Sequence, residues 1–282
     1  MRRHSNPPGL AAKAAGLPLY RYLGGNRDRL PAYASFGEVR EPDRRAEDAL
    51  AAMEQGFRAI KLRPRHATID EDVAEVRTVR RATGEELVIA CDANQGWRVD
   101  VFAEGPRWDL ERAVATARAF EEFGIEWLEE PLDQFDFEGY RQLRTRTSTP
   151  ISGGELAGDI WPLREMIERR AVDIVQPDAT FTGGIAGTLE MAALAREAGI
   201  GFSPHTWSNG LGLLANMHVL AATDGRWLEY PYDPPGWVPE ARDAMLSQPI
   251  RIDGDGMVPM PSGPGLGVEL DVDRIEACGT AI

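Results

Sequence analysis

The stretch 86-ELVIACDANQGW-97 sets a short apolar run directly before an aspartate, Asp92. The same arrangement recurs in IEWLEEPL, where the run leads to Glu129, and in TPISGGE, where it leads to Glu155. Short runs that are apolar at every position are typical of parallel strands buried on both faces. We therefore expect three successive strands in this part of the chain, each ending on a carboxylate.

Similar runs alternate with amphipathic segments from residue 31 onward. Residues 41–56 form one such segment, and residues 69–84 form another, with acids in its first turn and arginines near its end. We count eight strand-like runs with seven helical segments between them. This pattern predicts an α/β fold, a TIM-type (β/α)7β barrel. A doubly wound open sheet is the main alternative, but no glycine-rich turn follows the first strand-like run.

The chain divides into three parts around this barrel. We place the barrel at residues 31–235, because the alternation begins and ends there. Residues 1–30 precede it and contain one helical stretch. Residues 236–282 follow it and are rich in proline and glycine. We expect this last part to return along the outside of the barrel or to pack on another domain.

Composition limits the partners and the compartment. The net charge of −14 argues against nucleic acid or an anionic membrane as a partner. It does not exclude an anionic substrate, because groups inside a site set the local field. The two cysteines, Cys91 and Cys278, do not suggest a disulfide framework. No apolar run approaches the roughly 20 residues of a membrane span, and the first residues lack the apolar segment of a signal peptide. We expect a soluble cytoplasmic protein.

The three strand-end acids predict a divalent-metal site. Active sites of such barrels lie at the C-terminal ends of the strands, which is where the sequence places Asp92, Glu129 and Glu155. Three hard oxygen ligands without softer ones favour Mg²⁺, or Mn²⁺, over zinc. One such acid alone is more often a solvated loop residue or a helix cap. Three on adjacent strand ends favour the metal site.

Glu129 has an acidic neighbour, Glu130, and only one of the two is expected to face the metal. We favour Glu129 as the ligand and give Glu130 a supporting role. Pro131 follows directly, and a residue before proline is usually extended, so we expect Glu130 to be extended.

An aspartate and a histidine end the next two strand-like runs. Asp178 lies in VDIVQPDAT and His205 in IGFSPHTW. On neighbouring strands the carboxylate would orient the imidazole and raise its basicity, so the pair is a candidate for catalytic proton transfer. A lone histidine would more often be structural.

Two cations share one face of the second strand-like run. Lys61 and Arg63 are two residues apart and both are expected to point inward, where buried cations need acidic partners. They form either a structural ion-pair network or a clamp for a substrate carboxylate, with Lys61 stabilising an enolate. Glu229, in WLEYP at the last strand, is either a structural acid or, if protonated, a hydrogen-bond donor to the reacting carboxylate.

These motifs together resemble the enolase superfamily, and within it the mandelate racemase subgroup of the mandelate racemase/muconate lactonizing enzyme family. The resemblance runs from about residue 10 to the C-terminus. It implies a (β/α)7β barrel, Mg²⁺ bound by the three strand-end acids, a His205–Asp178 dyad, and a role for Glu229. The muconate-lactonising subgroup carries a lysine in place of the dyad and fits less well.

The resemblance also implies a chemistry, namely abstraction of the proton α to a carboxylate to give a metal-stabilised enediolate. Arg63 stands where the family usually has a basic lysine, and an arginine with a pKa above about 12 is a poor base. His205 is then the single base, which favours dehydration of a sugar acid over racemisation. Asn94 stands where some family dehydratases carry a second histidine. We place Asn94, Lys61, Arg63 and Glu229 in contact with the substrate. Racemase, epimerase or cycloisomerase activity on a hydroxy acid or lactone is the alternative.

Members of this family begin with a capping domain that closes over the barrel mouth. Residues 1–30 resemble the segment that follows this domain, so the capping domain is expected to be largely absent from this chain. An uncovered site is wet, which weakens electrostatic stabilisation. We expect the chain alone to be weakly active or inactive, and a truncated, non-catalytic relic is a further alternative. The expected partners are a small-molecule carboxylate substrate and further copies of the chain in a homo-oligomer.

Overall fold

A curved sheet of eight parallel strands forms the centre of the computed structural model, which describes residues 8–97 and 107–278. Along the sheet the strands follow the order β7-β6-β5-β4-β3-β2-β1-β8, so the last strand pairs with the first. Their bounds are β1 (Arg29–Ser35), β2 (Ala59–Leu62), β3 (Val88–Asp92), β4 (Leu128–Glu129), β5 (Ile151–Gly153), β6 (Ile174–Val175), β7 (Gly201–Phe202) and β8 (Leu228–Pro231).

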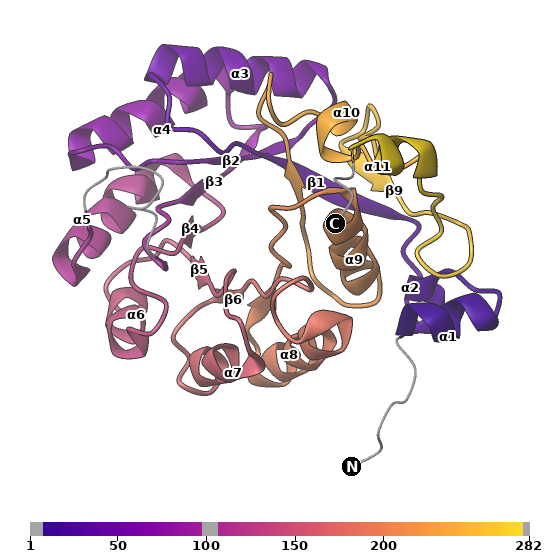
Figure 1. Cartoon of the computed structure of the whole chain (residues 1–282). Helices are drawn as coiled ribbons and strands as arrows, with labels where there is room; N and C mark the ends of the chain where they lie inside the picture. Colours follow the sequence, from indigo (N-terminus) through magenta and orange to yellow (C-terminus); the bar gives the residue numbers. More distant parts are fainter. Residues whose placement is uncertain (1–7, 98–106, 279–282) are drawn as a thin grey trace.

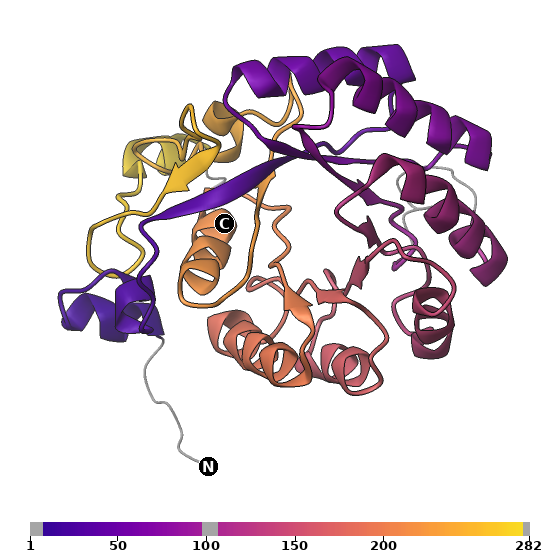
Figure 2. The same cartoon turned by 180° about the vertical axis from the view of Figure 1, so that it is seen from behind.

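Seven helices connect these strands and form an outer ring around the sheet (Figures 1 and 2). They are α3 (Pro42–Glu54), α4 (Ile69–Thr83), α5 (Leu110–Phe120), α6 (Phe137–Arg144), α7 (Ile160–Glu168), α8 (Gly184–Ala198) and α9 (Gly210–Ala221). Local signals set several of their ends. Thr68 and Glu71 form a capping box at the start of α4, and Gly199 ends α8 in the left-handed conformation. The predicted (β/α)7β barrel is confirmed.

The barrel closes between β7 and β8 without a ladder pair in the described residues. Side-chain hydrogen bonds join the two strand ends there. The Ser203 hydroxyl donates to the Trp227 carbonyl at 3.1 Å, and the Thr206 amide donates to Glu229 Oε2 at 2.8 Å. The second bond joins Glu229, a candidate site residue on β8, to the segment that follows β7.

The remaining elements lie beside β1 at the edge of the ring (Figure 2). They are α1 (Pro8–Ala14), α2 (Leu19–Tyr22), α10 (Pro239–Arg242), β9 (Met257–Pro259) and α11 (Val272–Cys278). β9 pairs antiparallel with the start of β1. The division into residues 1–30, 31–235 and 236–282 stays a prediction. Among the described residues, none of the helices has the length and apolar character needed to cross a bilayer.

His218 on α9 links the N-terminal helices and the C-terminal segment to the barrel. Its Nδ1 accepts a hydrogen bond from the Tyr20 amide at 3.1 Å, and its Nε2 lies 3.2 Å from the Leu266 carbonyl, so the ring is neutral with its proton on Nε2. Burial lowers the pKa of His218 from 6.5 to about 4. Protonation would remove the Tyr20 bond and place an uncompensated charge in the core.

This geometry predicts a loss of stability in mild acid. Between pH 6.5 and about 4 the unfolded chain binds a proton at His218 that the folded chain does not bind, so stability falls as pH falls through this window. The contribution at pH 5 is on the order of 1–2 kcal/mol. We expect urea denaturation to show a smaller difference between pH 7 and pH 5 for His218→Asn than for the wild type. Equal differences would contradict this role of His218.

Candidate metal centre and active site

The three strand-end acids meet at one end of the barrel. Asp92 ends β3, Glu129 ends β4 and Glu155 lies two residues beyond β5, and these three strands are neighbours in the sheet. One carboxylate oxygen from each lies within 4.8 Å of the others, and all three side chains are buried. The structure therefore brings together the acids that the sequence singled out.

A layer of apolar side chains lies one step below these polar groups inside the barrel. Side chains two residues apart on a strand share a face, and the positions two residues before Ser35, Lys61, Asp92, Glu129 and Glu229 are all buried. Those positions are Tyr33, Ala59, Ala90, Trp127 and Trp227, which form their own apolar cluster. The polar groups of the site thus lie on an apolar layer, where charges interact more strongly than in water.

Lys61 is enclosed by acids. Its ammonium lies 2.6 Å from Glu129 Oε1, 2.8 Å from Glu229 Oε1 and 3.4 Å from Asp92 Oδ2, and it is fully buried. Burial acts to lower the pKa of Lys61, but Glu129 and Glu229 raise it above its ordinary value. Lys61 is therefore a permanent cation, and its charge lowers the pKa of both Glu129 and Glu229.

Glu229, for which the sequence left open a structural acid or a protonated donor, is surrounded by hydrogen-bond donors. It accepts hydrogen bonds from the Ser35 hydroxyl at 2.7 Å and from the Thr206 amide at 2.8 Å, in addition to its contact with Lys61. Burial acts to raise the pKa of Glu229, but Lys61 and His205 lower it below its ordinary value. Its carboxyl group is therefore ionised, because three donors already surround it.

Arg63 forms the second cationic contact of the site. Its Nη1 contacts Asp92 Oδ2 and lies 3.1 Å from Asn94 Oδ1, while its Nε donates to the Phe36 carbonyl at 2.7 Å. The Asn94 amide group in turn donates to Asp92 Oδ2 at 3.1 Å. Arg63 and Asn94 therefore orient Asp92, in addition to the substrate contacts expected from the sequence.

His205 and Asp178 form the expected pair. His205 Nδ1 lies 2.9 Å from Asp178 Oδ2, and the other oxygen of Asp178 accepts from the Thr180 amide and from Asn216 Nδ2. This anchoring directs His205 Nε2 toward the acids, 3.3 Å from Glu155 Oε2 and 3.9 Å from Glu229 Oε2.

The imidazole lies in a strongly negative field. Burial acts to lower the pKa of His205, but Glu155, Glu229 and Asp178 raise it to about 10. Glu155 makes the largest of these raising contributions. A divalent cation beside Glu155 would oppose that contribution and favour the neutral imidazole, which is the form that can accept a proton.

The acid triad fits a hard divalent cation. Buried acids outnumber buried bases around it, since Asp92, Glu129, Glu130, Glu155, Asp178 and Glu229 face Lys61, Arg63 and His205. Glu155 Oε1 accepts from Trp97 Nε1 at 2.7 Å, but its Oε2 is buried without a hydrogen-bond partner. Burial raises the pKa of Glu155, with Glu129 adding to the increase against the opposing effect of His205. The His205 ring is the nearest cationic group to this carboxylate among the described residues, and oxygen-only ligands suit Mg²⁺.

Glu130 is not extended, contrary to the expectation from Pro131. Its φ is +44°, because the chain turns sharply there. Its amide donates to the Ser152 carbonyl, and its own carbonyl accepts from the Gln95 amide. Both side-chain oxygens are buried and have no hydrogen-bond partner in the part of the chain that the structure describes. Burial, Glu155 and Glu129 together raise the pKa of Glu130 well above its ordinary value. A Cβ at Gly96 would lie 2.3 Å from the Glu130 carboxyl carbon, so a side chain there would displace this carboxyl group.

Several contacts of the site were not predicted from the sequence. They come from Ser35, Trp97, Trp127, Gln176, Thr206 and Asn216. For two of them a signal existed. Trp127 lies two residues before Glu129 and Gln176 two residues before Asp178, and both donate to Glu129 Oε2, at 2.9 and 2.8 Å. The others come from the end of β1, from loops or from a distant helix, where spacing along the chain gives no indication.

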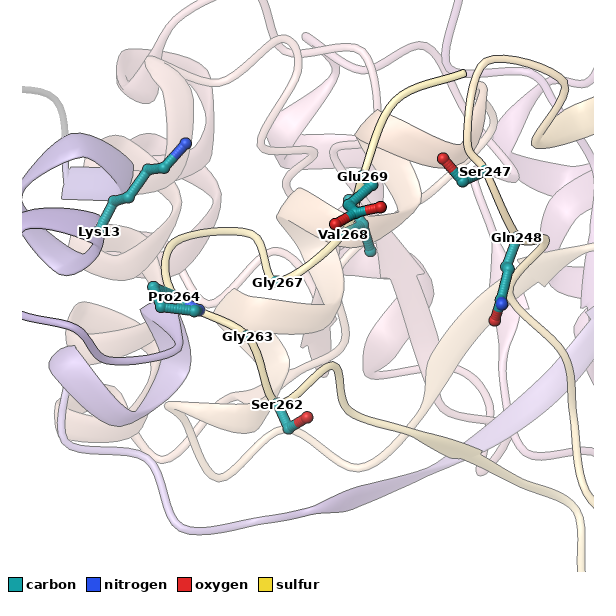
Figure 3. Close-up of a pocket in the computed structure, with 9 residues that line it drawn as sticks. All are labelled: Lys13, Ser247, Gln248, Ser262, Gly263, Pro264, Gly267, Val268 and Glu269. Atoms are coloured by element: carbon teal, nitrogen blue, oxygen red, sulfur yellow. The ribbon is translucent and has the colours of Figure 1, made fainter. Parts of the chain in front are cut away.

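A cavity of about 370 Å³ opens at Glu155 and His205. It is lined by Gly37, Arg63, Arg65, Asn94, Trp97, Glu155, Leu156, Phe181, His205 and Trp207. Lys61 and Glu229 are not among these residues, so their expected substrate contacts are not formed by the cavity wall. A larger cavity, about 720 Å³, lies between Lys13 of α1 and the C-terminal segment (Figure 3). It contains none of the site acids, so we place the active site in the smaller one.

Fold and site together define a barrel enzyme scaffold with an acidic centre and a histidine–aspartate pair at the C-terminal ends of its strands. Residues 44–274 match the family model described as "Enolase C-terminal domain-like". The chain belongs to this family, within the enolase superfamily, and the resemblance inferred from the motifs is confirmed.

Sugar-acid enzymes are among the relatives. The arabinonate dehydratase of Saccharolobus solfataricus is 30% identical over 92% of this chain and 66% of its own length. The L-talarate/galactarate dehydratase of Salmonella typhimurium is 35% identical over 78% of this chain and 52% of its own length. The chain thus spans about half to two thirds of these relatives. The crystal structure of the L-talarate dehydratase of Polaromonas sp. JS666 with Mg and L-glucarate has a TM-score of 0.82 and 32% identity, and the match covers 96% of this chain and 69% of that one.

Proposed function

We propose that this chain is the catalytic barrel of a Mg²⁺-dependent sugar-acid dehydratase. The proposal rests on one observation, namely that only one side of the site presents a group able to accept a proton. His205 Nε2 points at the acid triad from one side, while the β2 side presents Arg63, which stays protonated and contacts Asp92. One base beside a metal centre suits an elimination. Inversion at a carbon requires proton donors and acceptors on both of its faces.

Asp92, Glu129 and Glu155 would hold the ion. Mg²⁺ bound there would polarise the substrate carboxylate and lower the barrier to loss of the neighbouring proton. The Trp97 contact orients Glu155, and the Trp127 and Gln176 contacts orient Glu129. A related barrel enzyme contains Mg with a sugar acid, which supports the assignment of Mg²⁺ to this chain.

His205 would carry the proton through the reaction. Its Nε2 removes the proton from the carbon next to the carboxylate, and Asp178 stabilises the imidazolium that forms. The bond between the next carbon and its hydroxyl group then breaks, and the hydroxyl leaves as water with the proton from His205. The resulting enol becomes a 2-oxo acid. Arg63, at the cavity wall, would stabilise the charge that develops on the substrate carboxylate.

Incubation of sugar acids in D₂O with MgCl₂ tests this reaction. We expect a 2-oxo acid as the product and no epimer of the substrate, because the described site has one base. Semicarbazide trapping would detect the 2-oxo acid, and proton NMR would detect an epimer of the substrate. Exchange of the α-proton with inversion and without loss of water would overturn the proposal in favour of a racemase or epimerase. An isomeric product formed from a lactone would favour a cycloisomerase.

The variant Arg63→Lys is the matched control for this test. A lysine can still contact Asp92 but can lose its proton, so it adds a second base. We expect α-proton exchange with inversion to become detectable in this variant and not in the wild type. Equal product distributions in the two proteins would show that Arg63 does not decide the reaction.

A further inference from the structure

Arg65 lines the active-site cavity and has no part in the reaction described above. It follows β2, two residues after Arg63, and borders the same cavity as Glu155 and His205. The pKa of its guanidinium is lowered by burial and further by the neighbouring Arg63 and Arg107. Arg65 therefore stands close to two other positive charges, and the catalytic step described above does not use Arg65 itself.

Arg65 has no partner among the described residues. No described acid lies within 4.0 Å of it, it forms no hydrogen bond with them, and its Nε is buried. Arg63, in contrast, contacts Asp92 and the Phe36 carbonyl, and Arg107 donates to backbone carbonyls. A half-buried guanidinium without an acceptor has a free-energy cost that an anionic ligand would remove.

The cavity suits a small anionic ligand with two charged ends. Its volume of about 370 Å³ falls within the range of about 300–1,000 Å³ that is typical of small-molecule sites. One carboxylate of the substrate is used at the acid triad. Leu156, Phe181 and Trp207 add apolar surface to the cavity wall near Arg65.

We infer that Arg65 selects sugar diacids over sugar monoacids by binding the carboxylate at the far end of the substrate. This inference rests on the proposed dehydratase function. A guanidinium presents two parallel N–H groups that match the two oxygens of a carboxylate. Arg65 is thus a specificity-determining residue. It makes no contact with the reacting atoms.

The test compares diacids and monoacids that share the configuration of every hydroxyl-bearing carbon, such as galactarate with galactonate and glucarate with gluconate. For the better pair we expect the ratio of kcat/KM for diacid over monoacid to fall about 10- to 100-fold in Arg65→Met, the loss typical of one charged hydrogen-bonding contact. Arg65→Lys should retain part of the preference. Arg81→Met, which removes an exposed arginine from α4, should leave the ratio unchanged.

Binding measurements separate this inference from the function on which it rests. In a His205→Asn background, which lacks the base, calorimetry with MgCl₂ gives the Kd of both acids without turnover. A diacid preference that Arg65→Met abolishes supports the inference. Equal affinity and equal turnover for diacid and monoacid overturn it and leave the dehydratase proposal standing. Absence of both binding and turnover for every sugar acid overturns the dehydratase proposal itself. A preference for a 6-phosphorylated monoacid over the diacid would overturn the assignment of a carboxylate to Arg65.

Discussion

Replacing His205 by asparagine is expected to abolish dehydration while leaving the metal site intact. His205 Nε2 is the only imidazole nitrogen among the described residues that faces the acid triad, 3.3 Å from Glu155 Oε2. Loss of a positioned general base and acid costs about 10²- to 10⁴-fold in rate. We therefore expect kcat to fall by this factor on the substrate that the wild-type chain turns over best, measured by formation of the 2-oxo acid.

The affinity for Mg²⁺ should stay the same or rise in His205→Asn, although kcat falls. The imidazolium of His205 lies beside Glu155 in the absence of metal and competes electrostatically with a cation. Its removal is expected to keep or increase the affinity for Mg²⁺ in calorimetry. His66→Asn is the matched control, since His66 contacts Glu75 far along the chain from the dyad and should leave both kcat and Mg²⁺ affinity unchanged. Normal turnover by His205→Asn would refute the proposed role.

Asp178→Asn provides a second readout for the same mechanism. Asparagine can still contact Nδ1 but does not carry the charge that stabilises the imidazolium. We expect a loss of kcat without a matching rise in KM, because the substrate contacts come from other residues. If Asp178 had only a structural role, the substitution would lower thermal stability without a selective loss of kcat.

Replacing Glu155 by glutamine is expected to keep or raise the stability of the protein without metal. With saturating MgCl₂, the same substitution is expected to make the protein less stable than the wild type. With chelator present, the wild type contains a buried carboxylate oxygen without a hydrogen-bond partner and several acids close together. Glutamine removes one of these charges, so the variant should be as stable as the wild type or more stable. With saturating MgCl₂, the wild type gains RT ln(1 + [L]/Kd), about 2.7 kcal/mol at 100 times Kd, and the variant loses most of this gain.

Urea denaturation with chelator and with MgCl₂ measures the free energies of unfolding of the wild type and of Glu155→Gln in both conditions. Glu168→Gln, which removes an exposed carboxylate at the end of α7, should respond to MgCl₂ like the wild type. An equal gain from MgCl₂ in the wild type and in Glu155→Gln would show that Glu155 does not hold the ion. A lower stability of Glu155→Gln with chelator would show that its carboxylate is already compensated.

The barrel and the positions of the site acids could be predicted because both follow from local patterns. An apolar run followed by Asp92 or Glu129 marks a buried parallel strand and its end, and parallel strands in a barrel present these ends on one face. The pairing of Asp92 with Glu129 in the β3–β4 register follows from that arrangement. The same reasoning placed Asp178 and His205 near each other.

The protonation states and the partners of the site could not be predicted in this way. Glu229 within β8 and Glu130 directly after β4 are both buried glutamates, yet the pKa of Glu229 is lowered and that of Glu130 is raised. The difference comes from Lys61 and His205, which lower the pKa of Glu229, while Glu130 faces the acids Glu155 and Glu129. Each of these neighbours is brought in from a distant strand or loop.

The amino-acid sequence of this protein was sufficient to establish its (β/α)7β architecture, its family and the acids of its metal centre, because each depends on periodicity and strand order. The folded structure was needed to show that Lys61 is enclosed by acids, that Glu130 turns with a positive φ, and that Arg65 borders the cavity without a partner among the described residues. These features depend on distances between side chains far apart in sequence. Such distances are set by the packing of the closed barrel, and no local pattern encodes them.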